Sequence, residues 1–138
     1  SDDINSRVYV LCGDGELGEG QIWEAAMAAS AYKADNLVAI VDQNGLQAMG
    51  KVIERLNTNP LPEKWKSFGW NVVEINGHNM EEILTALDEA ETVKGQPTVI
   101  IAHTIKGKGI SFAENVVGFH NGVLTEETYN KALQELSI

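Results

Sequence analysis

The fold is decided by the stretch from residue 8 to residue 44, "VYVLCGDGELGEGQIWEAAMAASAYKADNLVAIVDQN". It opens with an apolar run at 8–12, passes through a helical pattern and closes with a second apolar run at 37–41. Both runs are rich in Val and Ile and nearly continuous rather than alternating, as is typical of strands covered on both faces. The stretch is therefore predicted to be one strand–helix–strand unit of a parallel sheet.

Two further runs of the same kind follow, "NVVEI" at 71–75 and "TVIIA" at 98–102. Helical patterns separate the runs, and no internal repeat, low-complexity tract or linker divides the chain. Strands and helices alternating at these lengths predict an α/β fold, with an open parallel sheet flanked by helices. Because 43 % of the 138 residues are hydrophobic, residues 1–138 are expected to form a single domain with one core.

Apolar residues spaced three and four positions apart predict three amphipathic helices. Their inward faces are expected to be Ile22, Ala25, Ala26, Ala29 and Tyr32 in the first, Met80, Ile83, Leu84, Leu87 and Ala90 in the second, and Tyr129, Ala132, Leu133 and Leu136 in the third. Asn79 and Glu82 are placed as a cap pair for the second helix, and the third begins at Thr125. A shorter helix in "PEKWKSFG" should end at Gly69.

The formal net charge of −10 argues against nonspecific binding to nucleic acid, whose phosphates attract basic surfaces. Any anionic ligand must therefore be held by local devices such as helix amino ends, a bridging metal ion or single lysines. No apolar run approaches the roughly 20 residues that cross a bilayer, and the first residues lack the pattern of a signal peptide. We expect a soluble cytoplasmic protein with no membrane partner, in which Cys12 is a buried strand thiol.

Polar residues follow each predicted strand. Because parallel strands point their carboxyl ends to one edge of the sheet, where ligands bind, these groups should be neighbours in space. They are Gly13-Asp14-Gly15, Asp42-Gln43-Asn44, Asn76-Gly77-His78 and His103-Thr104-Ile105-Lys106. The set has the character of a site for a hard cation and a phosphate.

Mg²⁺ takes oxygen ligands in near-octahedral geometry and commonly obtains one or two of them from side chains. Asp14 can supply one and Asn44 a second, with a loop carbonyl near Leu46 as a third. Gly15 lets the backbone approach a diphosphate, the helix beginning near Gly20 can direct its amino end there, and Lys106 can add a charge.

Each of these features also has a simpler explanation. An isolated Gly-Asp-Gly is more often a plain turn, and His78 and His103 can be ordinary strand-end histidines. The combination favours the functional interpretation, because Asn44 follows Asp14 after one complete strand–helix–strand step.

At this point the sequence resembles the thiamine diphosphate enzymes, whose cofactor motif is Gly-Asp-Gly, a helix and strand, and then an Asn-ending pair. The segments "GDGELGEGQIWEA", "DNLVAIVDQNG", "INGHNMEEI" and "HTIKGKGISF" are similar to transketolase, in particular to its amino-terminal half, which some organisms make as a separate subunit. The similarity runs over nearly the entire chain. The chain opens without Met, one short segment before a strand, which suggests a fragment lacking the family's upstream residues and their histidines.

The resemblance implies a set of site residues. Asp14, Asn44 and the Leu46 carbonyl would bind Mg²⁺ (or Ca²⁺ or Mn²⁺), and Gly13 and Gly15 would line the diphosphate of thiamine diphosphate. Lys106 would lie near the charged end of the cofactor, and His120 would be a catalytic histidine near the thiazolium ring and the diphosphate. Glu19 and Glu24 would lie at or near a subunit interface. In many relatives His-Gly is continuous, whereas here Asn121 separates His120 from Gly122.

The implied activity is transketolase-type transfer of a two-carbon ketol unit from a ketose phosphate to an aldose phosphate, as in the pentose phosphate pathway. The other half of the site would come from a carboxy-terminal transketolase subunit or domain, in a dimer or heterotetramer, so the chain alone should not turn over. Alternatives are deoxyxylulose phosphate synthase, a 2-oxo acid dehydrogenase component, or a noncatalytic module or fragment that keeps the fold.

Overall fold

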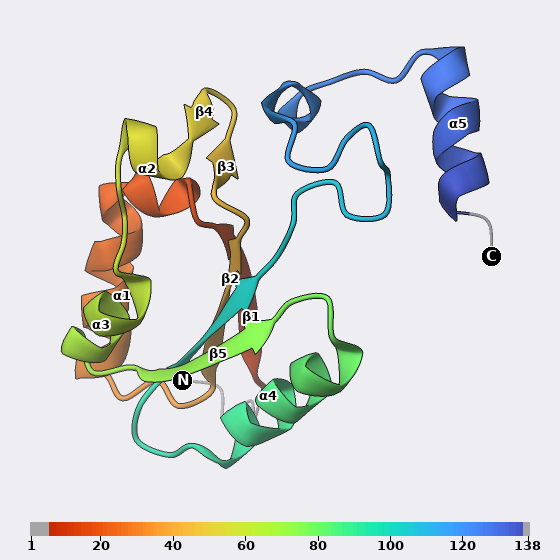
Figure 1. Cartoon of the computed structure of the whole chain (residues 1–138). Coiled ribbons are helices and arrows are strands. Elements are labelled where there is room, and N and C mark those ends of the chain that lie inside the picture. The colour runs from red at the N-terminus through yellow and green to blue at the C-terminus, as the bar shows by residue number, and fades with distance from the viewer. Residues whose placement is uncertain (1–5, 137–138) are drawn as a thin grey trace.

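The computed structural model describes residues 6–136, and these contain a four-stranded parallel sheet with helices on both faces (Figure 1). The strands are β1 (Val8–Gly13), β2 (Leu37–Gln43), β5 (Asn71–Asn76) and β6 (Thr98–His103), in the order β1-β2-β6-β5. All three pairings are parallel. The α/β fold class is confirmed, and each strand extends one or two residues past the predicted run.

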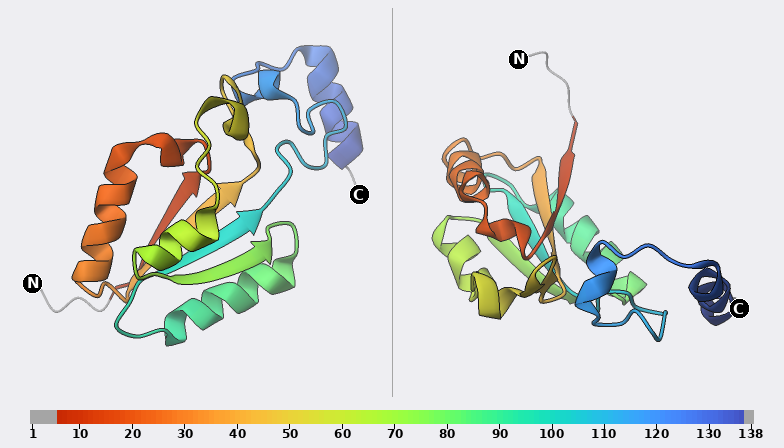
Figure 2. Two further views of the ribbon diagram at one scale, coloured as in Figure 1. Left: turned by 60° about the vertical axis from the view of Figure 1, so that its left-hand side comes forward. Right: turned by 90° about the horizontal axis from the view of Figure 1, so that it is seen from above.

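Helices cover the sheet from both sides (Figure 2). The helices α1 (Gly20–Ala31) and α3 (Leu61–Ser67) pack on one face, and α4 (Met80–Thr92) packs on the other. Side chains alternate across the sheet, so β2 gives Ala39 and Val41 to the first core and Val38 to the second. Cys12 is buried in the first core as predicted, and burial raises the pKa of its thiol.

The three tryptophans anchor the first core. Trp65 lies between the other two, with ring centroids 5.3 Å from Trp23 and 4.8 Å from Trp70. Trp70 donates its indole N–H to the Ala26 carbonyl at 2.9 Å, which ties α1 to the start of β5. The predicted short helix is α3, and Gly69 follows it with a φ of 82°, a left-handed conformation that favours glycine at a helix end.

The predicted cap of α4 is confirmed. Asn79 accepts hydrogen bonds from the backbone N–H groups of Glu81 and Glu82, and its amide donates to the Glu82 carboxylate at 2.8 Å. The predicted stripe is only partly inward, because Met80 and Leu84 are exposed while Ala86 and Ala90 are buried. The contact line is rotated from the predicted one because the small alanines let the helix lie close to the sheet.

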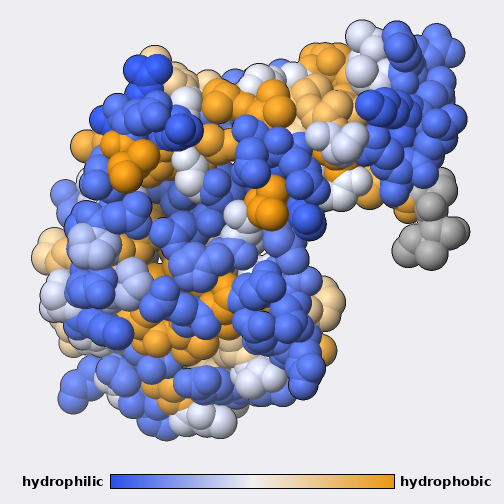
Figure 3. All heavy atoms as spheres, viewed as in Figure 1, coloured by the Kyte–Doolittle hydropathy of each residue, from blue (hydrophilic) through white to orange (hydrophobic). Residues whose placement is uncertain are grey.

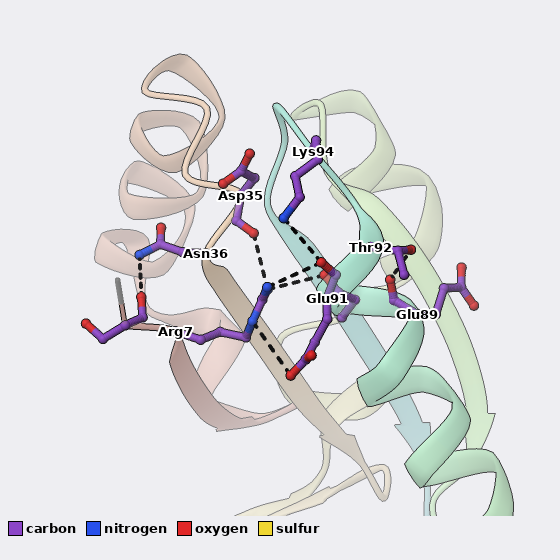
Figure 4. A network of polar contacts seen from close by, with 9 residues as sticks. Arg7, Asp35, Asn36, Glu89, Glu91, Thr92 and Lys94 are labelled. Atoms are coloured by element: carbon purple, nitrogen blue, oxygen red, sulfur yellow. Dashed lines mark hydrogen bonds and ion pairs between the residues drawn. The ribbon is translucent and has the colours of Figure 1, made fainter. Parts of the chain in front are cut away.

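Arg7 ties the start of β1 to the helix ends beside it (Figure 4). Its guanidinium donates to the carbonyls of Asp35, Ala90 and Glu91, each at 3.3 Å. Two of those carbonyls belong to the last turns of α4, where backbone acceptors lack helical partners. The arginine therefore fixes β1 against both the α1–β2 turn and α4.

The segment after β2 contains more regular structure than predicted. It forms a small antiparallel hairpin of β3 (Leu46–Gln47) and β4 (Gly50–Lys51), followed by the single turn α2 (Val52–Arg55). The hairpin is too short to give a periodic signal in the sequence. It overhangs the carboxyl edge of the sheet, where the predicted site lies (Figure 1).

Residues 104–136 form a C-terminal arm that extends away from the sheet, as both views in Figure 2 show. The arm contains the 3₁₀ turn η2 (Val117–His120) and the helix α5 (Glu126–Leu136), with Thr125 capping α5 through the Thr128 N–H at 3.2 Å. Ser111 fastens α5 to the loop before η2, since its N–H and hydroxyl donate to Glu135 at 2.6 and 2.7 Å.

Two predicted inward faces are wrong in part. In α5 only Ala132 is buried, whereas Tyr129, Leu133 and Leu136 are about half exposed, because the helix contacts a loop rather than the sheet. At the end of α1, Tyr32 is 84 % exposed. Figure 3 shows hydrophobic surface continuing along the upper edge toward α5, where Val116, Val123 and Leu124 are exposed.

Among residues 6–136, no helix has both the length and the apolar character needed to cross a membrane.

Candidate cofactor and metal site

Two cavities open at the carboxyl edge of the sheet, and they share Asn44 and Leu46. One, of about 470 Å³, we call the glycine cavity; its lining includes Gly13, Gly15, Glu16, Asp42, Lys106 and His120. The other, of about 510 Å³, we call the Asp14 cavity; its lining includes Asp14, Gln43, Lys51, Asn59, His103 and Asn115. The structure thus brings seven of the predicted residues to one edge of the sheet: Gly13, Asp14, Gly15, Asn44, Leu46, Lys106 and His120.

Asp14 is a buried carboxylate that is only half satisfied. It is 3 % exposed, and its Oδ2 accepts a hydrogen bond from the Gly45 N–H at 2.7 Å. Its Oδ1 is also buried and has no hydrogen-bond partner among the described residues. Burial raises the pKa of this carboxyl, and the nearby Asp42 adds to the effect, while the N–H groups of Gly45 and Gly15 oppose it. Such an oxygen is suited to a cation, which would supply the missing partner.

The sheet register brings Asn44 to this carboxylate. Gly13 pairs with Asp42 in the β1–β2 ladder, so Asp14 lies beside the end of β2. Gly45, at a φ of 76°, turns the chain so that its N–H meets Asp14. The Asn44 Oδ1 accepts the Leu46 N–H at 3.0 Å, a local turn that holds the side chain and the following carbonyl in place.

The two glycines serve different needs. A Cβ on Gly15 would lie 2.7 Å from the Gln47 Cβ, so the close approach of β3 excludes any side chain there. A Cβ on Gly13 would meet nothing within 4 Å, which leaves open space over the glycine cavity. The Gly13 N–H donates to the Glu16 carboxylate at 3.1 Å.

Charges of both signs line the glycine cavity. Glu16 and Asp42 contribute carboxylates, and Lys106 and His120 contribute the basic groups. Asp42 is held by the Thr104 hydroxyl, which ties the end of β2 to the start of the arm. An anionic ligand in this cavity would need an additional cation to offset the two acids.

The loop after β6 is closed on itself and positions Lys106. The Lys106 carbonyl accepts the Asn115 N–H at 2.9 Å, and a Cβ on Gly107 would lie 2.6 Å from the Ala113 carbonyl oxygen. Farther along the arm, η2 lies against β3 and brings the exposed His120 to the mouth of the glycine cavity.

Other predicted residues lie elsewhere. Glu19 is the exposed N-cap residue of α1, and Glu24 is exposed on the same helix; neither lines the two cavities. His78 lies outside them too, and its Nε2 accepts the Ile105 N–H at 2.8 Å. His103 contacts Glu74 at 3.1 Å but also lines the Asp14 cavity, as does Gln43. Sequence reasoning missed a site role for Gln43 and His103, because their position beside Asp14 follows from the strand order.

The donor set fits a hard cation. No three His, Cys, Asp or Glu side chains converge as a metal-binding group within residues 6–136. The available oxygens are one carboxylate, one amide and one backbone carbonyl, which leaves room for phosphate oxygens and water around Mg²⁺. A structural zinc site would need a full set of nitrogen or sulfur ligands instead.

Comparisons with known proteins identify the fold and its relatives. Residues 1–138 match the family described as "Transketolase, thiamine diphosphate binding domain". One of the two subunits of an apulose-4-phosphate transketolase, from Phocaeicola vulgatus, is 45 % identical over 136 residues, which are 99 % of this chain and 48 % of that protein. Human transketolase is 40 % identical over 135 residues, which are 98 % of this chain and 21 % of that protein.

The solved structure of transketolase from Campylobacter jejuni superposes with a TM-score of 0.89 at 38 % identity, covering 98 % of this chain and 21 % of that chain. The chain therefore spans about half the length of its subunit relatives and about a fifth of the full-length ones. With a full-length family match and a fold of the same architecture, this chain belongs to the transketolase family, as its thiamine diphosphate-binding domain.

Proposed function

We propose that this chain supplies the diphosphate and metal half of a transketolase active site that transfers a two-carbon ketol unit from a ketose phosphate to an aldose phosphate. The unpartnered Oδ1 of buried Asp14, adjacent to Asn44 and Leu46, is the observation that carries the proposal. These three residues would hold Mg²⁺, with Ca²⁺ or Mn²⁺ as substitutes, and the ion would bind the diphosphate.

The charges support a strict need for the metal. A diphosphate entering the glycine cavity would face Glu16 and Asp42 in a chain of net charge −10. Lys106 offers a single counter-charge, which is insufficient against two carboxylates and the buried Asp14. Cofactor binding should therefore be negligible without a divalent cation.

When bound, thiamine diphosphate supplies the nucleophilic carbon and the electron sink for ketol transfer. The chain's residues bind and orient: Gly13 leaves open space for the diphosphate, and Lys106 contributes positive charge. His120, exposed at the cavity mouth, can donate a hydrogen bond to a substrate oxygen or move a proton there.

The rest of the site would come from a partner. We propose a carboxy-terminal transketolase subunit or domain, assembled with this chain as a dimer or heterotetramer in the cytoplasm. Two relatives are named as transketolase subunits, and this chain covers 48 % and 49 % of them, which supports a split enzyme. Glu19 and Glu24, exposed near the start of α1, are proposed to contact that partner or a second copy.

A thermal shift experiment tests the cofactor half of this proposal. Thiamine diphosphate with Mg²⁺ should raise the Tm of the chain, whereas either component alone should have little effect, because a ligand selective for the folded state stabilises it. No shift with both present, for the chain and for any complex that copurifies with it, would favour a noncatalytic module.

A turnover assay tests the reaction class. Xylulose 5-phosphate should serve as donor once the partner subunit is added, and the isolated chain should be inactive. Preference for pyruvate as donor would instead favour the alternatives of deoxyxylulose phosphate synthase or a 2-oxo acid dehydrogenase component. Apulose 4-phosphate and 6-deoxy-6-sulfofructose should be included as donors, because two relatives are named for them.

A further inference from the structure

Gln43 lies beside Asp14 on the same face of the sheet. Gly13 pairs with Asp42 in the β1–β2 ladder, so the next residues along, Asp14 and Gln43, are neighbours. Cys12 and Val41 belong to the core under α1 and α3, and side chains two positions farther along a strand return to that face. Both side chains accordingly line the Asp14 cavity.

The amide of Gln43 is fixed in position. Its Nε2 donates to the Asn59 Oδ1 at 3.1 Å, and its backbone carbonyl accepts the Thr104 N–H at 3.2 Å. With the amide nitrogen engaged, the side-chain carbonyl oxygen Oε1 is directed elsewhere. That oxygen is buried and has no hydrogen-bond partner within the described residues.

The described residues contain three buried side-chain polar atoms without a partner: Asp14 Oδ1, Gln43 Oε1 and Trp65 Nε1. Both oxygens belong to the same cavity. Nearby basic groups are already engaged, since Lys51 pairs with Glu54 at 3.3 Å and the Nε2 of His103 with Glu74 at 3.1 Å. The donor that both oxygens require therefore comes from a ligand.

We propose that Gln43 Oε1 accepts a hydrogen bond from a water molecule bound to the cation that Asp14, Asn44 and Leu46 hold. Mg²⁺ and Mn²⁺ usually retain water molecules, whose hydrogens are strong donors because the ion polarises them. Gln43 is thus a positioning residue that acts through the water on the metal. This inference rests on the proposed function and assigns a role to a residue outside the three metal ligands.

Mn²⁺ binding tests this role without any activity readout. The full chain, or the complex if a partner copurifies, is titrated with Mn²⁺ in the presence of thiamine diphosphate, and free Mn²⁺ is measured by electron paramagnetic resonance. Gln43→Met, which removes the acceptor, should weaken Mn²⁺ binding by about tenfold. Gln43→Glu keeps an acceptor oxygen and should bind as tightly as the parent or more tightly. Gln96→Met, at an exposed position outside both cavities, should match the parent.

The two Gln43 variants separate a metal role from a structural one. A carboxylate cannot donate to Asn59, so if Gln43 only braced that loop, Gln43→Glu would lose as much Mn²⁺ affinity as Gln43→Met. That result, or unchanged binding in Gln43→Met, would overturn the inference while leaving the proposed function intact. Absence of Mn²⁺ binding in the parent would instead refute both.

Discussion

Asp14 is a carboxylate that the metal-free chain stabilises poorly. One oxygen has the Gly45 N–H, and the other is buried without a partner among the described residues, so burial raises the pKa of the group. An unsatisfied buried acceptor costs about 1–3 kcal/mol. The chain thus carries a local cost whose explanation is the cation it is proposed to bind.

Replacing Asp14 with Asn separates this cost from its use. Asp14→Asn keeps an oxygen for the Gly45 N–H and removes the buried charge, so the metal-free variant should be as stable as the parent or up to about 2 kcal/mol more stable. Calorimetry with Mg²⁺ and thiamine diphosphate should show at least about a hundredfold loss of affinity. Equal affinity in variant and parent would remove Asp14 from the site.

The same residue makes a signed pH prediction for the metal-free chain. Because the folded-state pKa of Asp14 is raised, the folded chain binds its proton more readily than the unfolded chain does. Its contribution to the free energy of unfolding therefore falls as pH rises from the unfolded pKa, about 3.9, through the raised value. Urea unfolding should show the parent losing stability relative to Asp14→Asn over that window. A constant difference between about pH 4 and about pH 7, values set by that window, would contradict it.

At the scale of elements, strands were predictable and helix faces were not. The runs at 8–12, 37–41, 71–75 and 98–102 are rich in Val and Ile and nearly continuous, so composition alone identifies them. Helix faces depend on what covers them, which periodicity does not contain. Met80 and Tyr129 have the correct spacing, yet no element within residues 6–136 buries either of them.

The capping pair of α4 has a measurable worth. Asn79→Ala removes the acceptor for two N–H groups of the first turn, so the free energy of unfolding should fall by about 1 kcal/mol. Chemical denaturation measures this, and Asn79→Asp, which keeps the acceptor, should lose much less. Equal losses in the two variants would show that the amide bond to Glu82 matters more than the cap.

The attachment of α5 can be tested at a single carboxylate. Glu135 accepts both donors of Ser111, and these bonds lower the pKa of its carboxyl. Glu135→Gln should therefore speed amide hydrogen exchange at Ser111 several-fold, while the unfolding midpoint stays the same because α5 lies away from the sheet. Glu127→Gln, on the same helix without that contact, serves as the control. Unchanged exchange at Ser111 would show that other contacts hold the arm.

For the whole molecule, the sequence predicted which loops meet, and strand order determined how. Parallel strands guarantee one shared edge, so Asp14, Asn44 and Lys106 could be grouped from the sequence pattern alone. The order β1-β2-β6-β5 also places Gln43 between Asp14 and His103, and puts Asn76 and His78 at the far strand, outside both cavities. Pattern does not encode that order.

The net charge of −10 acts on the molecule as a whole. Like charges repel more in the compact state than in the unfolded chain, and salt screens them over a distance of about 10 Å at 0.1 M. Raising NaCl from about 0.02 to about 0.3 M should therefore raise the Tm of the metal-free chain by a few degrees. The same salt should weaken Mg²⁺ binding, because the attraction of the acidic chain for the ion is screened too. If salt lowered the Tm, specific ion pairs such as Arg7–Glu91 would outweigh the general repulsion, and the acidic surface would be a minor factor in stability.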